Sequence, residues 1–349
     1  MTTSDGVSSA GLYGFKNRII NGDMRIDQRN AGASVTPLTG ATYTVDRWLT
    51  AFAQSSKFSI QRNAGSVTPP VGFTNYLGAT SLSAYSVVSS DFFTLQQNIE
   101  GLNVSDLAWG TASAATVTLS FWVRSSLTGT FGGAINNSGG SRSYPFSYTI
   151  NSANTWEQKS ITIAGDTTGT WLTTNGIGIT VNISIGMGST YLGTAGAWAA
   201  GSYYAPTGST NVVGTNGATF YITGVQLEKG STATSFDYRP YGTEFSLCQR
   251  YLPVIAAGSY LPAYSISTTQ AYSTPTLQVP TRTAPTGITV TVSGNLYNAG
   301  TGQALTNIVF TAASTTNLLL TGTVASGLTA GQGNMLFTNN QILATGCEL

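Results

Sequence analysis

The sequence predicts an all-β protein: a jelly-roll β-sandwich, then a short helix, then a smaller C-terminal β-sandwich domain. Composition is the first observation. Aromatic residues make up 11% of the chain and charged residues only 8%, and a chain poor in Lys and Glu but rich in Ser, Thr, Gly and Val favours strands over helices. Patterning is the second, because several segments alternate apolar and polar residues with the period of two that is typical of half-buried strands.

The length predicts more than one domain. The chain has 349 residues, whereas a single hydrophobic core stops growing at about 250–300 residues. We expect a flexible or partner-bound N-terminal segment over 1–16, a jelly-roll domain over 17–240, a connecting helix over 241–252 and a C-terminal β domain over 253–349.

The strands of the first domain are predicted from alternation. Residues 18–30 are interpreted as a first strand, and 116–124 alternates most cleanly. That segment is expected to place one set of side chains in the core, namely Val117, Leu119, Phe121 and Val123, and the other set on the opposite face of the strand, namely Thr118, Ser120, Trp122 and Arg124. Further strands are predicted over 144–150, 158–165, 176–186 and 218–228, each bounded by turn residues. Seven or more strands favour a sandwich of the jelly-roll kind.

One short helix follows the first domain. Pro240 blocks continued strand pairing, and Phe245, Cys248 and Leu252 then recur at helical spacing. Thr243 is expected to cap the helix and Pro253 to end it.

Strands return after the helix. The predicted segments lie within 276–294, 307–314, 316–325 and 341–349, and together they predict the smaller β domain.

Charge is distributed unevenly along the chain. Residues 228–250 hold six of the 27 formal charges, and only Arg282 and Glu348 follow. A β domain with almost no charge lacks the charged residues that normally prevent strands from associating. We therefore expect this domain to be buried in an obligate homo-oligomer. The alternative is a monomer kept in solution by its hydroxyl groups.

Several functional classes are disfavoured. The chain has no histidine, which removes Ser-His-Asp and Cys-His arrangements and most zinc sites. A net charge of +1 without a basic cluster argues against nucleic acid as a partner, and no apolar stretch is long enough to insert into a membrane. We expect no metal, no cofactor and no secretory signal, and we expect Cys248 and Cys347 to be reduced.

Aromatic residues among Asn, Ser and Thr suggest a surface that binds sugar, because a flat ring covers the apolar face of a pyranose while amides and hydroxyls bond its edge. Trp122 with Arg124 is the first candidate pair. The loop that carries Trp198, Tyr203 and Tyr204 is the second. The alternative is that these rings fill the core or a subunit interface.

A further set of residues is expected to be structural. Asp46 adjoins Arg47 and Trp48, and Asp237 lies two residues from Arg239. Buried Asp–Arg pairing that fixes strand ends is the preferred interpretation, and ligand binding is the alternative. Glu244 and Arg250 complete this charged seam between the two domains.

Catalysis has no support in the spacing of the acids. Glycoside hydrolysis needs two carboxylates roughly 5–10 Å apart. The available acids are Asp91, Glu100, Asp106, Glu157 and Asp166, and nothing in their positions selects a pair, so we expect a protein that is not an enzyme.

Several motifs in order resemble a known family. The segments are NRIINGDMRIDQRN, YTVDRW, QNIEG, TVTLSFWVRSS, NTWEQKSITIAGDTTGTW and GVQLEKGSTATSFDYRPYGTEFSLCQRYL, spanning about residues 17–252. Together they resemble the jelly-roll domain, similar to carbohydrate-binding modules, that recurs in bacteriophage tail fibres, head fibres and other virion proteins. Related sugar-binding domains hold a calcium ion near the position of Arg25, where this chain departs from their pattern.

The resemblance implies a protein of the virion surface, assembled in the host cytoplasm and often trimeric. Its partners would be other virion proteins of the capsid or tail and a host surface polysaccharide. Two alternatives remain open: a capsid cement or decoration protein without a ligand, and a polysaccharide depolymerase.

Overall fold

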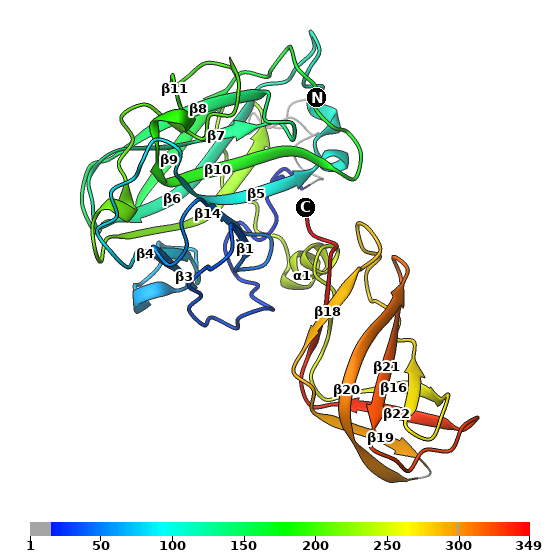
Figure 1. Ribbon diagram of the computed structural model, residues 1–349. Coiled ribbons are helices and arrows are strands. Elements are labelled where there is room, and N and C mark those ends of the chain that lie inside the picture. Colours follow the sequence, from blue (N-terminus) through cyan, green and yellow to red (C-terminus); the bar gives the residue numbers. More distant parts are fainter. Residues whose placement is uncertain (1–14, 299) are drawn as a thin grey trace. The chain divides into compact units, whose positions relative to one another are not determined.

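A computed structural model describes residues 15–298 and 300–349. The chain divides into two compact units, Met1–Pro240 with Leu349 and Tyr241–Glu348 (Figure 1). Most of the N-terminal segment expected over 1–16 lies outside the described residues.

The first unit is built on two main antiparallel sheets. The larger has seven strands in the order β1-β2-β5-β10-β7-β8-β12. Their bounds are β1 Ala41–Tyr43, β2 Leu49–Phe52, β5 Phe92–Glu100, β7 Gly129–Asn136, β8 Arg142–Ile150, β10 Ile177–Met187 and β12 Ala199–Ala200.

The second main sheet has five strands in the order β3-β4-β14-β6-β9. Their bounds are β3 Phe58–Arg62, β4 Leu77–Ser81, β6 Val117–Ser125, β9 Glu157–Ile163 and β14 Thr219–Lys229. A small parallel pair is formed by β11 Leu192–Gly193 and β13 Ala205–Pro206. Short 3-10 turns lie at Ala64–Ser66, Gly101–Asn103, Ser105–Leu107, Ser189–Tyr191 and Val212–Gly214.

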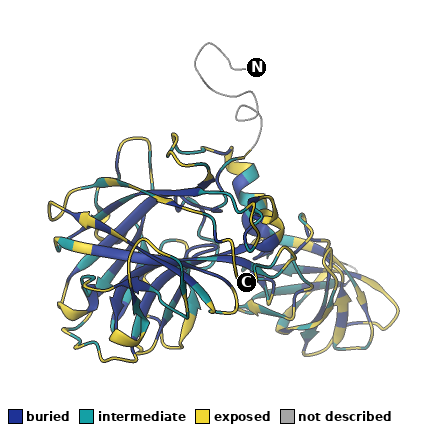
Figure 2. Cartoon of the chain, turned by 90° about the horizontal axis from the view of Figure 1, so that it is seen from above, coloured by how far each residue is buried: buried dark blue, intermediate teal, exposed yellow. Residues whose placement is uncertain are grey.

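The core of the first unit lies between the two main sheets. Alternation in β6 works as predicted, since Leu119, Phe121 and Val123 are at most 1% exposed and belong to the main core cluster. Phe131 and Ile183 reach the same cluster from the seven-stranded sheet. Figure 2 shows the burial along these strands and the exposed loops between them. The all-β class and the sandwich are confirmed for this unit.

Residues 18–30 do not form the strand that alternation predicted. Asn21 and Met24 adopt positive φ, at 57° and 58°, which a strand does not permit. The segment instead bonds to β14 at two isolated points, through Arg18 N–H to the Leu227 carbonyl and through the Gly22 carbonyl, which accepts from Val225. Its apolar side chains are buried all the same, so burial produced the pattern without regular strand pairing.

The helix begins at the expected residue, 241, but ends at Gln249 and not at 252 before Pro253. Helix α1 spans Tyr241–Gln249, so Thr243 lies inside it and is not the cap. The helix starts directly after Pro240, since a proline at the start of a helix loses no intrahelical hydrogen bond. Cys248 of the helix and Leu252 beyond it are buried. Helix α1 belongs to the second unit.

The second unit contains a closed antiparallel barrel in the order β16-β17-β21-β20-β19-β22. The bounds are β16 Ser259–Ser265, β17 Gln270–Ser273, β19 Gly294–Asn298, β20 Thr301–Ala313, β21 Leu318–Val324 and β22 Gly333–Thr338. A separate three-stranded sheet joins β15 Val254–Ile255, β23 Ile342–Thr345 and β18 Gly287–Val290.

The expected C-terminal sandwich is therefore a barrel with an added sheet. Closure occurs because β16 pairs with both β17 and β22, and β22 pairs in turn with β19. Leu296, Leu320 and Leu336 fill the barrel and are essentially unexposed. A sandwich leaves strand edges open, whereas closure removes them.

Candidate functional site

Trp122 lies on the outer face of the five-stranded sheet, as its place in β6 predicted. It is half-buried, while its neighbours Phe121 and Val123 point into the core. Across the sheet it pairs with Gln158 of β9 on one side and Thr223 of β14 on the other. The sheet thus presents an indole ring flanked by an amide and a hydroxyl residue.

A hollow of about 220 Å³ surrounds this tryptophan. Ser120 and Gln158 contribute from the sheet, and Thr234 from the segment after β14. Gln158 is exposed, and its side-chain amide makes no hydrogen bond within the described part of the chain. Its donor and acceptor are therefore available to a ligand.

Three further rings form a wall of the hollow. Phe73 and Phe236 meet edge to face with centroids 5.2 Å apart, and Tyr238 lies 4.9 Å from Phe236 and 5.6 Å from Phe73. Tyr238 is 53% exposed, and its hydroxyl donates to the Gly72 carbonyl. The sequence analysis missed these rings, although aromatic residues at positions 236 and 238 stand close together in the seam and could have signalled them.

Gly224 permits this wall to form. It occupies the irregular point of β14 where the register with β6 shifts, and it adopts φ 61°. A β-carbon at this position would lie only 2.6 Å from the Phe73 ring. Only glycine therefore lets Phe73 pack against the backbone at this position without displacement.

Trp122 also differs from the other tryptophans in its hydrogen bonding. Five of the six tryptophans donate the indole N–H to a backbone carbonyl, and the pairs are Trp48 to Asn21, Trp109 to Ala115, Trp156 to Thr68, Trp171 to Thr168 and Trp198 to Ala164. Trp122 makes no such bond within the described residues. The indole N–H of Trp122 therefore has no acceptor in the described residues, unlike the N–H groups of the other five tryptophans.

Arg124 does not share the hollow with Trp122. Its guanidinium lies over the Tyr221 ring at 5.4 Å, and its Nε donates to the Asn154 carbonyl at 3.0 Å. Tyr221 in turn packs against Tyr76, which contacts Trp156. The structure thus places Arg124 beside a second aromatic group on the same face, engaged with protein groups.

Trp198 belongs to a cluster of three tryptophans. Its ring lies 5.4 Å from Trp109 and 5.4 Å from Trp171, and those two lie 4.7 Å apart, all edge to face. Arg142 stands 5.9 Å from the Trp198 ring and forms two 2.7 Å hydrogen bonds to Asp166. The Trp198 ring is thus packed against two other indoles and the Arg142 guanidinium.

The structure separates Tyr203 from Tyr204. Tyr203 lines a second hollow, of about 390 Å³, together with Trp198. Tyr204 instead stacks on Tyr191 at 5.3 Å and lies near Phe92. Of the second candidate set, only Trp198 and Tyr203 meet at one place.

Asp46, Arg47 and Trp48 do not pair with one another. The Asp46 carboxylate accepts from the backbone and side chain of Gln28, and burial raises its pKa although these bonds lower it. Arg47 donates to the Asn98 carbonyl. Trp48 is wholly buried. All three residues are buried, and the Asp46 carboxylate bonds to Gln28 and not to Arg47.

The second part of the charged seam does contain the expected Asp–Arg ion pair, although most of its bonds run to the backbone. Asp237 accepts from the backbone N–H groups of Lys16 and Asn17 at 3.0 and 3.2 Å. Arg239 donates to the Ile19 carbonyl at 3.1 Å, and its Nε is 3.9 Å from Asp237. These two residues thus hold the segment around 16–19 to the end of the first unit.

Glu244 and Arg250 lie in the second unit. Glu244 falls in the first turn of α1 and is buried. Arg250 follows the helix, where its carbonyl accepts from Arg282 N–H at 3.0 Å.

The acids that could serve in catalysis are engaged elsewhere. Glu157 accepts from Lys159, and although burial raises its pKa, Lys159 and the N–H groups of Ser152 and Asn151 lower it to about 2. Asp166 is paired with Arg142. Asp91 accepts from the Tyr85 hydroxyl at 2.7 Å. These three carboxylates are bound to separate partners.

In the described ranges 15–298 and 300–349, no group of three or more Cys, Asp or Glu side chains could hold a metal ion. Near Arg25, the Asp23 carboxylate pairs with that arginine. Asp27 accepts from the N–H groups of Asn30 and Gly32.

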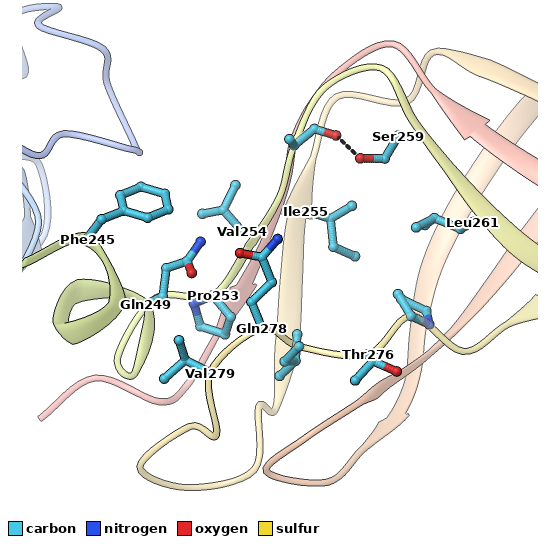
Figure 3. Close-up of a pocket in the computed structure, with 13 residues that line it drawn as sticks. Phe245, Gln249, Pro253, Val254, Ile255, Ser259, Leu261, Thr276, Gln278 and Val279 are labelled. Carbon is cyan, nitrogen blue, oxygen red and sulfur yellow. Dashed lines mark hydrogen bonds between the residues drawn. The ribbon is translucent and has the colours of Figure 1, made fainter. Parts of the chain in front are cut away.

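A groove of about 290 Å³ occurs in the second unit (Figure 3). Phe245 and Gln249 of α1 form one side, and Val254, Ile255 and Leu261 form another. Its lining contains no ionisable side chain. It offers an apolar surface but no group for acid–base chemistry.

Among the described residues, no helix is long and apolar enough to cross a membrane.

Comparison with known proteins gave only distant structural likenesses. No protein-family model and no curated protein matches the chain. The enzymatically active domain of bacteriophage CBA120 tailspike protein 4 is 11% identical, with a TM-score of 0.33 over 61% of this chain and 21% of that one. This chain thus spans about a fifth of that domain.

Two carbohydrate-binding structures are similar at the same level. The family 11 carbohydrate-binding module of a Clostridium thermocellum cellulase is 13% identical, with a TM-score of 0.29 over 58% of this chain and 99% of the module. The N-terminal CBM22-1-CBM22-2 tandem domain from Paenibacillus barcinonensis Xyn10C is 9% identical, with a TM-score of 0.27 over 91% of this chain and 99% of that domain. Likenesses this distant do not assign a function.

Proposed function

We propose that the first unit binds a polysaccharide at the hollow around Trp122, without chemistry. One observation carries the proposal: Trp122 is the one tryptophan of the described chain whose indole N–H has no backbone acceptor, and it lies on the solvent side of a complete sheet. A tryptophan that served only packing would be expected to have this donor satisfied, as the other five do.

The surroundings of Trp122 suit a sugar. The ring offers an apolar face, and the free amide of Gln158 offers a donor and an acceptor beside it. Pyranose rings combine an apolar face with equatorial hydroxyls, so one sugar unit can use both groups at once. The hollow carries no ionisable side chain apart from the distal phenol of Tyr238, which favours a neutral sugar at the point of contact.

The wider role follows from the family resemblance of the sequence. The chain is proposed to be a structural protein of a phage virion, a tail fibre or head appendage, that assembles as a homotrimer and attaches to a host surface glycan. Each site needs only weak affinity, because linked copies raise the effective affinity by about 10²–10⁴-fold. A location on the virion surface follows from this role.

Retention of the protein on immobilised host polysaccharide tests the proposal. Trp122→Ala should abolish retention. Trp122→Phe keeps a ring but removes the N–H, and should retain part of it.

Gln158→Ala should weaken retention, whereas Thr162→Ala is a matched control on the same strand and face. Thr162 is exposed, and its hydroxyl is bound to the Ser231 carbonyl. Full retention by Trp122→Ala with unchanged thermal stability would contradict a binding role for this hollow.

The two alternatives give different results. A cement protein without a ligand would show no retention in the wild-type protein, and Trp122→Ala would impair assembly. A depolymerase would release oligosaccharide from the polysaccharide during incubation.

A further inference from the structure

The barrel of the second unit carries an uncharged aromatic surface on its outside. Four neighbouring strands contribute, in the order β17, β16, β22, β19. Alternation places Leu261, Leu296 and Leu336 inside the barrel, so the residues between them point outward. We call these outward residues the tyrosine face: Tyr260, Pro262, Tyr264, Tyr272, Tyr297, Met335 and Phe337.

Strand register makes the tyrosine face continuous. Tyr264 lies opposite Tyr272, and Met335 lies between Pro262 on one side and Tyr297 on the other. These neighbours stand about 5 Å apart across the strands. The side chains therefore adjoin one another over four strands.

Rings lie at both ends of the face, with apolar side chains in the middle. Tyr260 contacts Phe337 at 4.6 Å between centroids and lies 6.3 Å from Tyr297. Tyr264 is four residues farther along β16, about 13 Å away at roughly 3.3 Å per residue. Exposure is high for side chains of this kind, at 56% for Tyr260, 52% for Tyr264 and 43% for Met335.

No charge interrupts this face. The strands β16, β17, β19, β20, β21 and β22 contain no Asp, Glu, Lys or Arg. After Arg250 the sequence has only Arg282 and Glu348. Arg282 donates to the carbonyls of Cys347 and Glu348 at 2.8 and 2.6 Å, away from the barrel strands.

We propose that the tyrosine face is the surface through which the second unit contacts further copies of itself. This inference rests on the homo-oligomer proposed above and assigns its interface. In a homotrimer, residues that lie close to the three-fold axis meet their own counterparts from the other copies. A charged face would bring like charges together at the axis, whereas this face pairs with itself without that repulsion.

Barrel closure determines the kind of contact. An open edge strand could pair with another chain through its backbone, but every strand of this barrel already has two partners within the barrel. Association must therefore use side chains. Tyrosine, phenylalanine and methionine are enriched in the centres of protein interfaces, where charged residues are depleted.

Sedimentation of the full chain at micromolar concentration tests the inference. Met335→Lys places a charge at the middle of the face, and Thr289→Lys is the matched control. Thr289 is exposed on β18 and lies outside the barrel. The wild type and Thr289→Lys should sediment as the same oligomer, and Met335→Lys should raise the dissociation constant by at least about tenfold. A circular dichroism spectrum shows that each variant is folded.

The contrary outcomes separate the two proposals. An oligomer that persists in folded Met335→Lys overturns the assignment of the interface but leaves the oligomer intact. A monomeric wild type overturns both. A monomer whose retention on polysaccharide falls in Met335→Lys also overturns the inference and makes the tyrosine face a ligand surface.

Discussion

Replacement of Gly224 by alanine tests how the wall of the Trp122 hollow is built. Gly224 adopts φ 61°, and a β-carbon there would stand 2.6 Å from the Phe73 ring. The left-handed backbone costs a non-glycine residue about 1–2 kcal/mol. Displacing a packed ring costs about 1–3 kcal/mol more. We therefore expect Gly224→Ala to destabilise the first unit by about 2–5 kcal/mol.

Gly217→Ala is the matched control for this change. Gly217 also has a positive φ, 73°, but a β-carbon there would meet no atom within 4 Å. Gly217→Ala should lower the free energy of unfolding only by the cost of the left-handed backbone, about 1–2 kcal/mol. The difference of about 1–3 kcal/mol corresponds to at least ~2 °C in the melting temperature of a domain of this size.

Thermal unfolding followed by near-ultraviolet circular dichroism measures this difference, and retention on polysaccharide measures its effect on the hollow. Gly224→Ala should also weaken retention, because Phe73 must move. Equal losses of stability in the two variants would show that Phe73 does not press against this backbone, and the argument for the wall would be refuted.

Three further predictions concern the core, the ion pairs and the thiols. Phe121→Ala empties a site that is 1% exposed beside Tyr148, so unfolding should require about 3–5 kcal/mol less, measured by denaturant titration. A loss under ~1 kcal/mol would place Phe121 outside the rigid core. Burial raises the pKa of Asp166, but its bonds from Arg142 and Thr168 outweigh burial and lower the pKa below 3.8. The stabilising contribution of the Asp166 carboxylate is therefore present above pH 3.8 and is lost as the pH falls through the lower folded-state pKa. Asp166→Asn should lower the melting temperature at neutral pH. In acid, the melting temperature of the variant should decrease less with falling pH than that of the wild type. A variant whose melting temperature runs parallel to the wild type at every pH argues against this. Burial raises the pKa of Cys347 to about 11 despite its bond with Thr281, so a thiol reagent at neutral pH should label Cys347 only as fast as the second unit opens, and immediate labelling would contradict its burial.

Alternation in the sequence identified the core-facing residues of β6. Residues 117–124 fixed which side chains of β6 enter the core and put Trp122 outside, because the period of two follows directly from strand geometry. Other strands gave no such signal. In β5 and β7 the outward side is covered as well, so Thr94 and Ala134 are as buried as the core residues beside them.

The hollow around Trp122 could be predicted only in part from local sequence patterns. Trp122 was predictable from its own strand, but Phe73 and Phe236 come from loops about 50 and 110 residues away along the chain. Their meeting depends on the glycine at 224 and on long-range packing. The same limit applies to Asp46, whose neighbour in sequence is Arg47 but whose partner in space is Gln28.

The sequence by itself determined three features: the composition, the two faces of the clearest strands and the scarcity of charge after Arg250. Each of these is a property of single residues or of residues two apart. Tertiary structure decided that the C-terminal strands close into a barrel and do not stack as a sandwich. Closure joins Ser259 to Thr338, and a period of two states which face of a strand is buried but not which distant strand will complete its hydrogen bonds.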